Sequence, residues 1–255
     1  MTGAIIDLTG RRALVTGSSR GIGRALALGL ARAGADVAVH AASRIDAAEA
    51  VADEIRGLGR RSAAFLCDLG RAEAIDPFVD AVEGVFGGVD ILIANASMQI
   101  RAPWHEISRD ASLAQTETNL HSTLRLFQRL IPPMRARRWG RVLTIGSVQQ
   151  WQPHPMMAIY AATKTAVESL ARSVARDVAA DGVTVNNLAP GVIATDRTEG
   201  VLADPGYRAA VVERIPVGFV GEAEDCVGLA LVLASDAGRY ITGTNIPVDG
   251  GQHVV

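Results

Sequence analysis

The chain has 255 residues, of which 49% are hydrophobic and 26 are glycine, and its formal net charge is −2. This composition excludes a disordered chain and provides enough apolar surface for a sizeable core. Because the net charge is slightly negative, no basic excess favours nucleic acid or an anionic membrane as a partner. No apolar run is long enough to span a bilayer and no leader is evident, so we expect a soluble, cytoplasmic protein.

The cysteines and a cluster of arginines do not indicate a metal or phosphate site. Cys67 and Cys226 stand far apart in apolar runs, without the spacing of metal ligands. We therefore expect buried free thiols, no metal and a reducing compartment. A cluster of arginines is more typical of a solvated helix end than of a phosphate site; it comprises Arg135, Arg137, Arg138 and Arg141.

Short apolar runs alternate with amphipathic stretches along the whole chain. Strands are predicted over 13–16, 37–40, 62–66, 91–94, 142–145, 183–188 and 246–248. Several of these runs are apolar throughout, as expected for parallel strands that are covered on both faces. Helical spacing appears between them, as in Ile22, Leu26, Leu30 and Ala33. The alternation predicts one doubly wound α/β domain over residues 1–255, with a parallel sheet.

A glycine-rich turn joins the first predicted strand to the first predicted helix. It reads Thr16-Gly17-Ser18-Ser19-Arg20-Gly21-Ile22-Gly23. Glycine allows the backbone to approach a ligand closely, and the amino end of a helix offers free N–H groups to phosphate. The spacing Gly-x-x-x-Gly-x-Gly differs from the commoner Gly-x-Gly-x-x-Gly. The position of the turn between strand and helix is therefore the stronger indication of a dinucleotide site.

Lys164 is the single lysine of the chain, and the other 24 of the 25 basic residues are arginine. It follows Tyr160 by four positions, which places both side chains on one face of a helix. A nearby cation lowers the pKa of a phenol from about 10 toward the range of general acid–base catalysis. Coincidence on a solvated helix is the alternative interpretation.

With these motifs the chain resembles the short-chain dehydrogenase/reductase family. The other matching positions occur in the family's order and are Asn95-Ala96, Asn119, Ser147, Pro190-Gly191 and Asp249-Gly250-Gly251. The resemblance covers essentially the whole chain. It implies a seven-stranded doubly wound sheet, an NAD or NADP cofactor, and hydride transfer between a nicotinamide and a carbonyl or alcohol.

The resemblance also implies roles for individual residues. Tyr160 is the acid–base, and Lys164 lowers its pKa and binds the nicotinamide ribose. Ser147 follows a strand and hydrogen-bonds the substrate oxygen, while Asn119 anchors a water in a proton relay. The implied cofactor-binding residues are Gly17, Ser19, Arg20, Gly21, Ile22, Gly23, Ser43, Asp68, Asn95, Tyr160, Lys164, Pro190, Gly191, Ile193 and Thr195. The implied substrate-binding residues are Ser147, Gln149 and Tyr160.

The end of the second predicted strand indicates which cofactor is used. NAD-selective folds place an acid there, about twenty residues after the glycine turn. In this chain the stretch reads His40-Ala41-Ala42-Ser43-Arg44, and Asp36 lies at the wrong end of the strand. Arg20, Ser43 and Arg44 instead suit the 2′-phosphate of NADP. NADP(H) is thus favoured over NAD(H), the alternative being that Arg44 is merely exposed.

Three stretches bear on the substrate. Ser97 stands where the family usually has the glycine of Asn-Asn-Ala-Gly, and it adds a side chain beside the cofactor. In the segment 149–157, Gln149 can bind a polyol or carboxylate, and Trp151 can supply an apolar wall. The segment 195–214 resembles a mobile substrate lid, in which Arg197 and Arg208 can meet an acidic substrate.

Several functions stay open. The turn and the tail resemble the branch of gluconate 5-dehydrogenase-like and 3-oxoacyl reductase-like enzymes, so sugar acids, polyols, ketones and ketoacyl thioesters are all candidate substrates. A non-catalytic NADP-binding sensor is a different class, and the intact catalytic set disfavours it. An epimerase or dehydratase of the extended family would need further carboxyl-terminal residues. The long helices expected over 116–135 and 158–180 carry apolar residues on more than one side, which favours a homotetramer.

Overall fold

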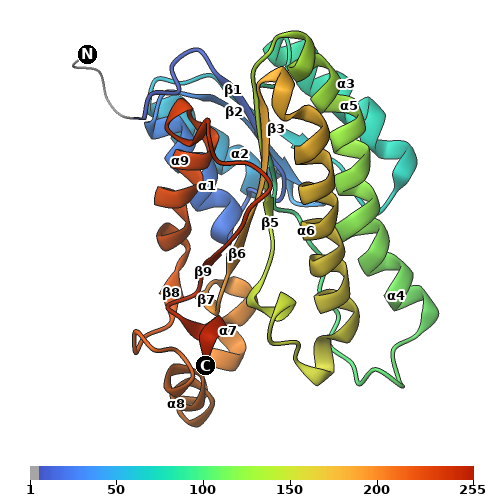
Figure 1. The fold of residues 1–255 in the computed structure, drawn as a ribbon, viewed down its shortest axis with the longest axis vertical. Coiled ribbons are helices and arrows are strands. Elements are labelled where there is room, and N and C mark those ends of the chain that lie inside the picture. Colours follow the sequence, from blue (N-terminus) through green and yellow to red (C-terminus); the bar gives the residue numbers. More distant parts are fainter. Residues whose placement is uncertain (1–5) are drawn as a thin grey trace.

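The structure is a computed structural model that describes residues 6–255, so the first five residues of the predicted domain lie outside it. Its centre is a seven-stranded parallel sheet with the order β3-β2-β1-β4-β5-β6-β9 (Figure 1). The strands are β1 (Arg12–Val15), β2 (Asp36–Ala41), β3 (Ser62–Leu66), β4 (Ile91–Ala94), β5 (Gly140–Ile145), β6 (Val183–Pro190) and β9 (Asn245–Val248). Each overlaps a predicted run, which confirms the doubly wound fold.

Both faces of the sheet are covered by helices. Ala13 and Val15 of β1 pack into one core, whereas Leu14 between them packs into the other. Figure 1 shows the two helical layers. The first holds α1 (Gly21–Arg32), α2 (Ile45–Gly57) and α9 (Val227–Ala234), and the second holds α3 (Ala72–Phe86), α5 (Ser122–Ala136) and α6 (Ala158–Val178). Coverage on both sides explains why the strands are apolar nearly throughout.

The strand order reverses at β1, which lies between β2 and β4. In open α/β sheets, ligands bind beyond the carboxyl ends of the strands at such a point. After β6 the chain leaves the main sheet and forms a short parallel pair, β7 (Ile193–Ala194) with β8 (Gly221–Glu222). The predicted lid lies between these two strands and contains α7 (Asp196–Leu202) and α8 (Pro205–Glu213).

Both cysteines are buried free thiols, as predicted. Burial raises the pKa of Cys67 to about 11 and that of Cys226 to about 12, so neither is a reactive thiolate. Between residues 6 and 255, none of the helices combines the length and the hydropathy needed to cross a membrane.

The arginine cluster was interpreted only partly correctly. Arg135, Arg137 and Arg138 do lie at the carboxyl end of α5. Arg141, however, belongs to β5, which begins two residues earlier than predicted, and its side chain is 4% exposed. It donates to the Ser235 carbonyl oxygen at 3.0 Å and to Asp236 at 2.8 Å. Arg141 is therefore a buried structural residue.

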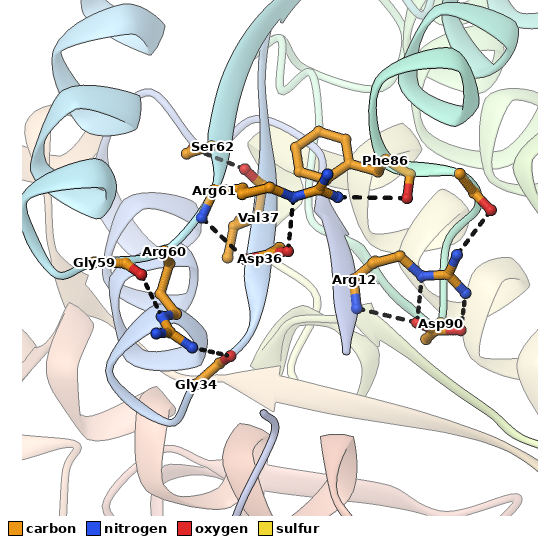
Figure 2. Close-up of polar contacts among 11 residues, drawn as sticks. Arg12, Gly34, Asp36, Val37, Gly59, Arg60, Arg61, Ser62, Phe86 and Asp90 are labelled. Atoms are coloured by element: carbon orange, nitrogen blue, oxygen red, sulfur yellow. Dashed lines mark hydrogen bonds and ion pairs between the residues drawn. The ribbon is translucent and has the colours of Figure 1, made fainter. Parts of the chain in front are cut away.

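Ion pairs connect the amino ends of neighbouring strands to adjacent segments (Figure 2). Arg12 at the start of β1 donates Nε and Nη2 to the carboxylate of Asp90, both at 2.7 Å, and its backbone N–H donates to the same group at 3.1 Å. Asp36 at the start of β2 accepts from Arg61 Nε at 3.0 Å. Asp36 therefore lies at the amino end of its strand, as the sequence indicated.

The Arg12–Asp90 pair should be a strong determinant of stability. Asp90→Asn should lower the free energy of unfolding by about 1–3 kcal/mol, because it leaves a partly buried guanidinium without its anion. Burial raises the pKa of Asp90, but Arg12 outweighs it and the net pKa lies below the ordinary 3.8. The stabilisation is thus present above this value and is lost as the pH falls through the lower, folded-state pKa.

Urea denaturation of both proteins between pH 7 and pH 3 measures this effect. Asp53→Asn is the matched control, since Asp53 pairs with Arg56 on the exposed surface of α2 and such pairs contribute little. Equal losses in the two variants would contradict a special role for the Arg12–Asp90 pair.

Candidate active site

A cleft of about 960 Å³ opens at the carboxyl ends of the strands, and its size suits a dinucleotide with a small substrate. The predicted site residues that line it are Gly17, Ser19, Arg20, Gly21, Ile22, Gly23, Asp68, Asn95, Ser147, Gln149, Tyr160, Lys164, Pro190, Gly191, Ile193 and Thr195. Ser43 and Asn119 are not among the lining residues. The sheet thus brings together residues that are up to 178 positions apart in the chain, from Gly17 to Thr195.

The glycine turn has the geometry of a phosphate cradle. Gly17 and Gly21 adopt φ values of 63° and 53°, which favour glycine. A Cβ on Gly23 would lie 2.3 Å from the Gly17 carbonyl oxygen, so any side chain there would break the turn. No side chain caps the amino end of α1, which leaves its first N–H groups free for a ligand. These features fit the pyrophosphate of a dinucleotide.

Two polar side chains, Asn95 and the buried His40, hold this turn in place. Asn95 Nδ2 donates to the carbonyl oxygens of Thr16 at 2.9 Å and Gly17 at 3.0 Å, which ties the loop after β4 to the turn. The Gly17 N–H donates to His40 Nδ1 at 2.9 Å, and His40 Nε2 bonds the Cys67 carbonyl oxygen at 2.8 Å. Burial lowers the pKa of His40 to about 4, so the ring is neutral at neutral pH. His40 was not predicted as a site residue, because no motif includes it.

The end of β2 carries no acid. Ala41 and Ala42 line the cleft there, and neither has a polar side-chain group that could bind a ribose hydroxyl. Arg20 lines the cleft and is 3.8 Å from Asp196, an exposed pair that a ligand can displace easily. Arg44 is exposed and, like Ser43, is not among the residues that line the cleft.

Asn119 holds the catalytic region together from outside the cleft. It lies in a π-helical turn, Glu117–His121, that interrupts the helix predicted over 116–135. Its side chain accepts from the Met98 N–H at 2.7 Å, and donates to the Met98 carbonyl oxygen at 2.9 Å and to Thr163 Oγ1 at 3.0 Å. Thr163 Oγ1 in turn donates to the Tyr160 carbonyl oxygen at 2.8 Å. Asn119 thus joins the loop after β4 to α6, and π turns often mark functional sites.

Lys164 lies one turn after Tyr160 on α6, and both side chains are buried at the cleft. Lys164 Nζ donates to the Ile145 carbonyl oxygen at 2.6 Å and lies 5.6 Å from the centroid of the Tyr160 ring. Burial, with a smaller contribution from the charge of Arg197, lowers the pKa of Lys164 from 10.5 to about 7. The ammonium is therefore poised to exchange a proton near neutral pH.

The pKa of Tyr160 differs from the sequence-based expectation. Burial raises it above 10, and this effect outweighs the charge of Arg197 and the hydrogen bonding of Ser147, Ser97 and Arg197, all of which lower it. Lys164 is not among the groups that lower this pKa. The physical reason is desolvation. It favours the neutral form of the phenol, and it also favours the neutral form of Lys164.

The segment between Ser147 and Tyr160 borders the cleft as predicted, although not every residue named in the prediction lines it. Gln149 lines the cleft, and its Oε1 accepts from the His154 N–H at 2.6 Å. Trp151 is not a lining residue, because its ring packs against His253 with 5.5 Å between centroids. In the lid, Arg197 lines the cleft whereas Arg208 does not.

Comparison with known proteins places the chain in a family. A family model described as enoyl-(acyl carrier protein) reductase matches residues 17–253. The gluconate 5-dehydrogenase of Gluconobacter oxydans is 39% identical, over 97% of this chain and 96% of that protein. The 2-dehydro-3-deoxy-D-gluconate 5-dehydrogenase of Pseudoalteromonas atlantica is 38% identical, over 96% of each chain.

Solved structures agree. A 3-oxoacyl (acyl-carrier-protein) reductase of Agrobacterium tumefaciens with NADP bound superposes with a TM-score of 0.92 and 42% identity, covering 96% of this chain and 95% of that one. The chain therefore belongs to the short-chain dehydrogenase/reductase family, as its motifs predicted. It is an oxidoreductase that acts on CH–OH groups.

Substitution of the single lysine tests its role in this site. Lys164→Arg should lower turnover at least about a hundredfold although it keeps a positive charge, because the planar guanidinium cannot occupy the compact site at the Ile145 carbonyl. Tyr160→Phe should lose similar activity while it still binds NADPH. The double variant should be little worse than either single variant.

Steady-state turnover at saturating cofactor, together with NADPH fluorescence titration, measures both effects. Near-normal turnover in Lys164→Arg would show that any cation suffices at this position.

Proposed function

We propose that the chain uses NADP(H) to interconvert a secondary alcohol and a carbonyl on a small polyhydroxylated substrate, a sugar acid or polyol. The observation that carries this proposal is the amide lining of the cleft, made up of Gln99, Gln149, Gln152 and Gln252. Oε1 of Gln152 and of Gln252 is buried and has no hydrogen-bond partner among residues 6–255. Glutamine amides that line a cleft can donate to and accept from the hydroxyl groups of a substrate, whereas an acyl chain offers no such groups.

The proposed mechanism assigns one task to each buried polar group. Bound NADP(H) supplies or removes the hydride. Ser147 lies beside Tyr160 and donates a hydrogen bond to the substrate oxygen, which fixes the reacting carbon. During reduction the phenol of Tyr160 delivers the proton to that oxygen, and during oxidation it takes the proton back. Lys164 takes up and returns protons for Tyr160, because its pKa of about 7 permits both protonation states.

The role proposed for Asn119 is positioning. Both ends of its amide are bound to Met98 and Thr163, so it orients α6 against the loop after β4. A water anchored in this region would have to use groups other than the Asn119 side chain.

The choice of NADP(H) is supported by the cleft and by relatives. Ala41 and Ala42 provide no carboxylate to repel a 2′-phosphate, and Arg20 is available once it leaves Asp196. Several similar structures were solved with NADP bound.

A competing candidate is a 3-oxoacyl thioester reductase, which the similarity to the Agrobacterium enzyme supports. The amide lining disfavours it. A non-catalytic sensor is disfavoured by the burial of Lys164, since an unreactive site has no use for a desolvated ammonium.

We further propose that residues 1–255 form one domain, with 195–214 as the substrate lid, and that four copies assemble in the cytoplasm. The two cores cover opposite faces of one sheet, which supports a single domain.

Leu124 on α5 is 38% exposed, and Leu170 and Val174 on α6 are only half-buried, which leaves apolar surface for a second copy. Light scattering that gave a monomer at micromolar concentration would contradict the assembly.

Cofactor preference can be measured directly. NADPH should bind about ten- to a hundredfold more tightly than NADH, as expected for charge-assisted contacts to a phosphate. Ala42→Asp should reverse the preference by placing a carboxylate at the end of β2. Fluorescence titration of both reduced cofactors tests this, and equal affinities in the unsubstituted protein would contradict it.

A substrate panel tests the reaction itself. Gluconate and related sugar acids should reduce NADP⁺ with higher kcat/KM than simple alcohols, because the glutamine amides bind their hydroxyl groups. In the reverse direction, NADPH consumption should be slower with a 3-oxoacyl thioester than with a keto sugar acid. The opposite order would favour the thioester reductase.

A further inference from the structure

Arg197 of α7 crosses the cleft to the loop after β4. Its Nη1 and Nη2 each donate to Ser97 Oγ at 3.3 Å, and Nη2 also donates to the Ser97 carbonyl oxygen at 3.0 Å. The contact joins residues 100 positions apart. A glycine, which is usual in the family at position 97, would offer the carbonyl oxygen but no hydroxyl. Ser97 thus makes a specific contact with the lid.

Several arginine side chains around this contact have no acidic partner among residues 6–255. Arg101, Arg197 and Arg214 all line it, and within the described part of the chain none of them forms an ion pair. The whole chain nevertheless has a net charge of −2. Uncompensated positive charge in a cleft attracts an anionic ligand.

Among these arginines, Arg197 acts on the groups assigned to catalysis. Burial raises the pKa of Tyr160, and the positive charge of Arg197 is the next largest influence and lowers it. For Lys164, burial lowers the pKa and the charge of Arg197 lowers it further. Because Arg197 and Tyr160 line the same cleft, an anion bound to Arg197 would lie in the cleft that holds the phenol.

We propose that Arg197 recognises the carboxylate of the substrate, and that Ser97 is its partner while the substrate is absent. This inference rests on the proposed function and narrows it to acids. A guanidinium binds a carboxylate through two short, charge-assisted hydrogen bonds, whereas its bonds to Ser97 reach neutral oxygens at 3.0–3.3 Å. A substrate carboxylate can thus displace Ser97 from Arg197, because it binds the guanidinium more strongly. The substrate carbons next to the bound carboxylate then lie near Tyr160.

The part of the chain that carries Arg197 can adjust to the substrate at low cost. Leu202, Ile215 and Val220 form a small cluster that is separate from the two cores of the sheet. Figure 1 shows α7 and α8 beyond the end of the sheet at which β6 leads into β7. Few buried apolar contacts therefore oppose a shift of α7.

Binding of D-gluconate and sorbitol to the protein–NADPH complex tests the proposal. Sorbitol carries a CH₂OH group where gluconate carries the carboxylate, so the pair isolates the anion. With NADPH bound the nicotinamide is already reduced and gluconate cannot be oxidised, so calorimetry reports binding without turnover. The variants are Arg197→Gln, Arg197→Lys and Ser97→Gly, and the control is Arg208→Gln, a lid arginine that does not line the cleft.

Arg197→Gln should weaken gluconate binding about ten- to a hundredfold and leave sorbitol binding within about twofold. The affinity of Arg197→Lys for gluconate should fall between those of this variant and the unsubstituted protein, because lysine keeps the charge but cannot form two parallel hydrogen bonds. Ser97→Gly should keep or tighten gluconate binding, and Arg208→Gln should change neither ligand. Equal losses for both ligands in Arg197→Gln, or no loss for gluconate, would overturn the proposal. A loss of gluconate affinity in Ser97→Gly would overturn the role of Ser97.

The outcome separates this inference from the proposed function. If gluconate binds through Arg197 but no sugar acid reduces NADP⁺, the proposed reaction fails while the assignment of Arg197 stands. If sugar acids are oxidised and Arg197→Gln leaves their KM unchanged, the assignment fails while the proposed reaction stands.

Discussion

Burial of the Lys164 ammonium at the carboxyl end of β5 is the constraint around which the site is organised. A charged group is desolvated there at considerable cost, and its one direct hydrogen bond within residues 6–255 goes to the Ile145 carbonyl oxygen at 2.6 Å. This bond requires α6 to lie close against β5, which in turn brings Tyr160 to the end of the sheet. The same desolvation lowers the pKa of the lysine and raises that of the tyrosine, so it favours the neutral form of both groups.

Two polar anchors make this arrangement rigid, and both attach to the loop after β4. Asn119 binds Met98 in that loop and reaches α6 through Thr163. Asn95 binds the carbonyl oxygens of the glycine turn, whose Gly17 N–H is held by the neutral ring of His40. The loop thus links the cofactor cradle to the catalytic helix at the point where the strand order reverses. Such preorganisation is what an electrostatic catalyst needs.

Sequence patterns predicted the strands and most of the cleft, because alternation and the glycine turn are local signals. They failed where distant residues decide the outcome. Arg141 is buried because Asp236, 95 positions away, accepts its hydrogen bond. The contact of Ser97 with Arg197 and the capture of Gly17 by His40 likewise depend on how strands are placed side by side. The π turn at Asn119 leaves no periodic signature, since five residues are too few to shift a helical pattern.

The single lysine allows the central claim to be tested without assignment, because protein labelled with ¹³C-lysine gives one Cε resonance. Its chemical shift, followed from pH 5 to pH 11 in the cofactor-free protein, reports the pKa of Lys164 directly. The account predicts a midpoint near 7, well below the ordinary 10.5, since burial disfavours the charged form. A midpoint near 10.5 would contradict it, because the ammonium would then be solvated and could not exchange a proton near neutral pH.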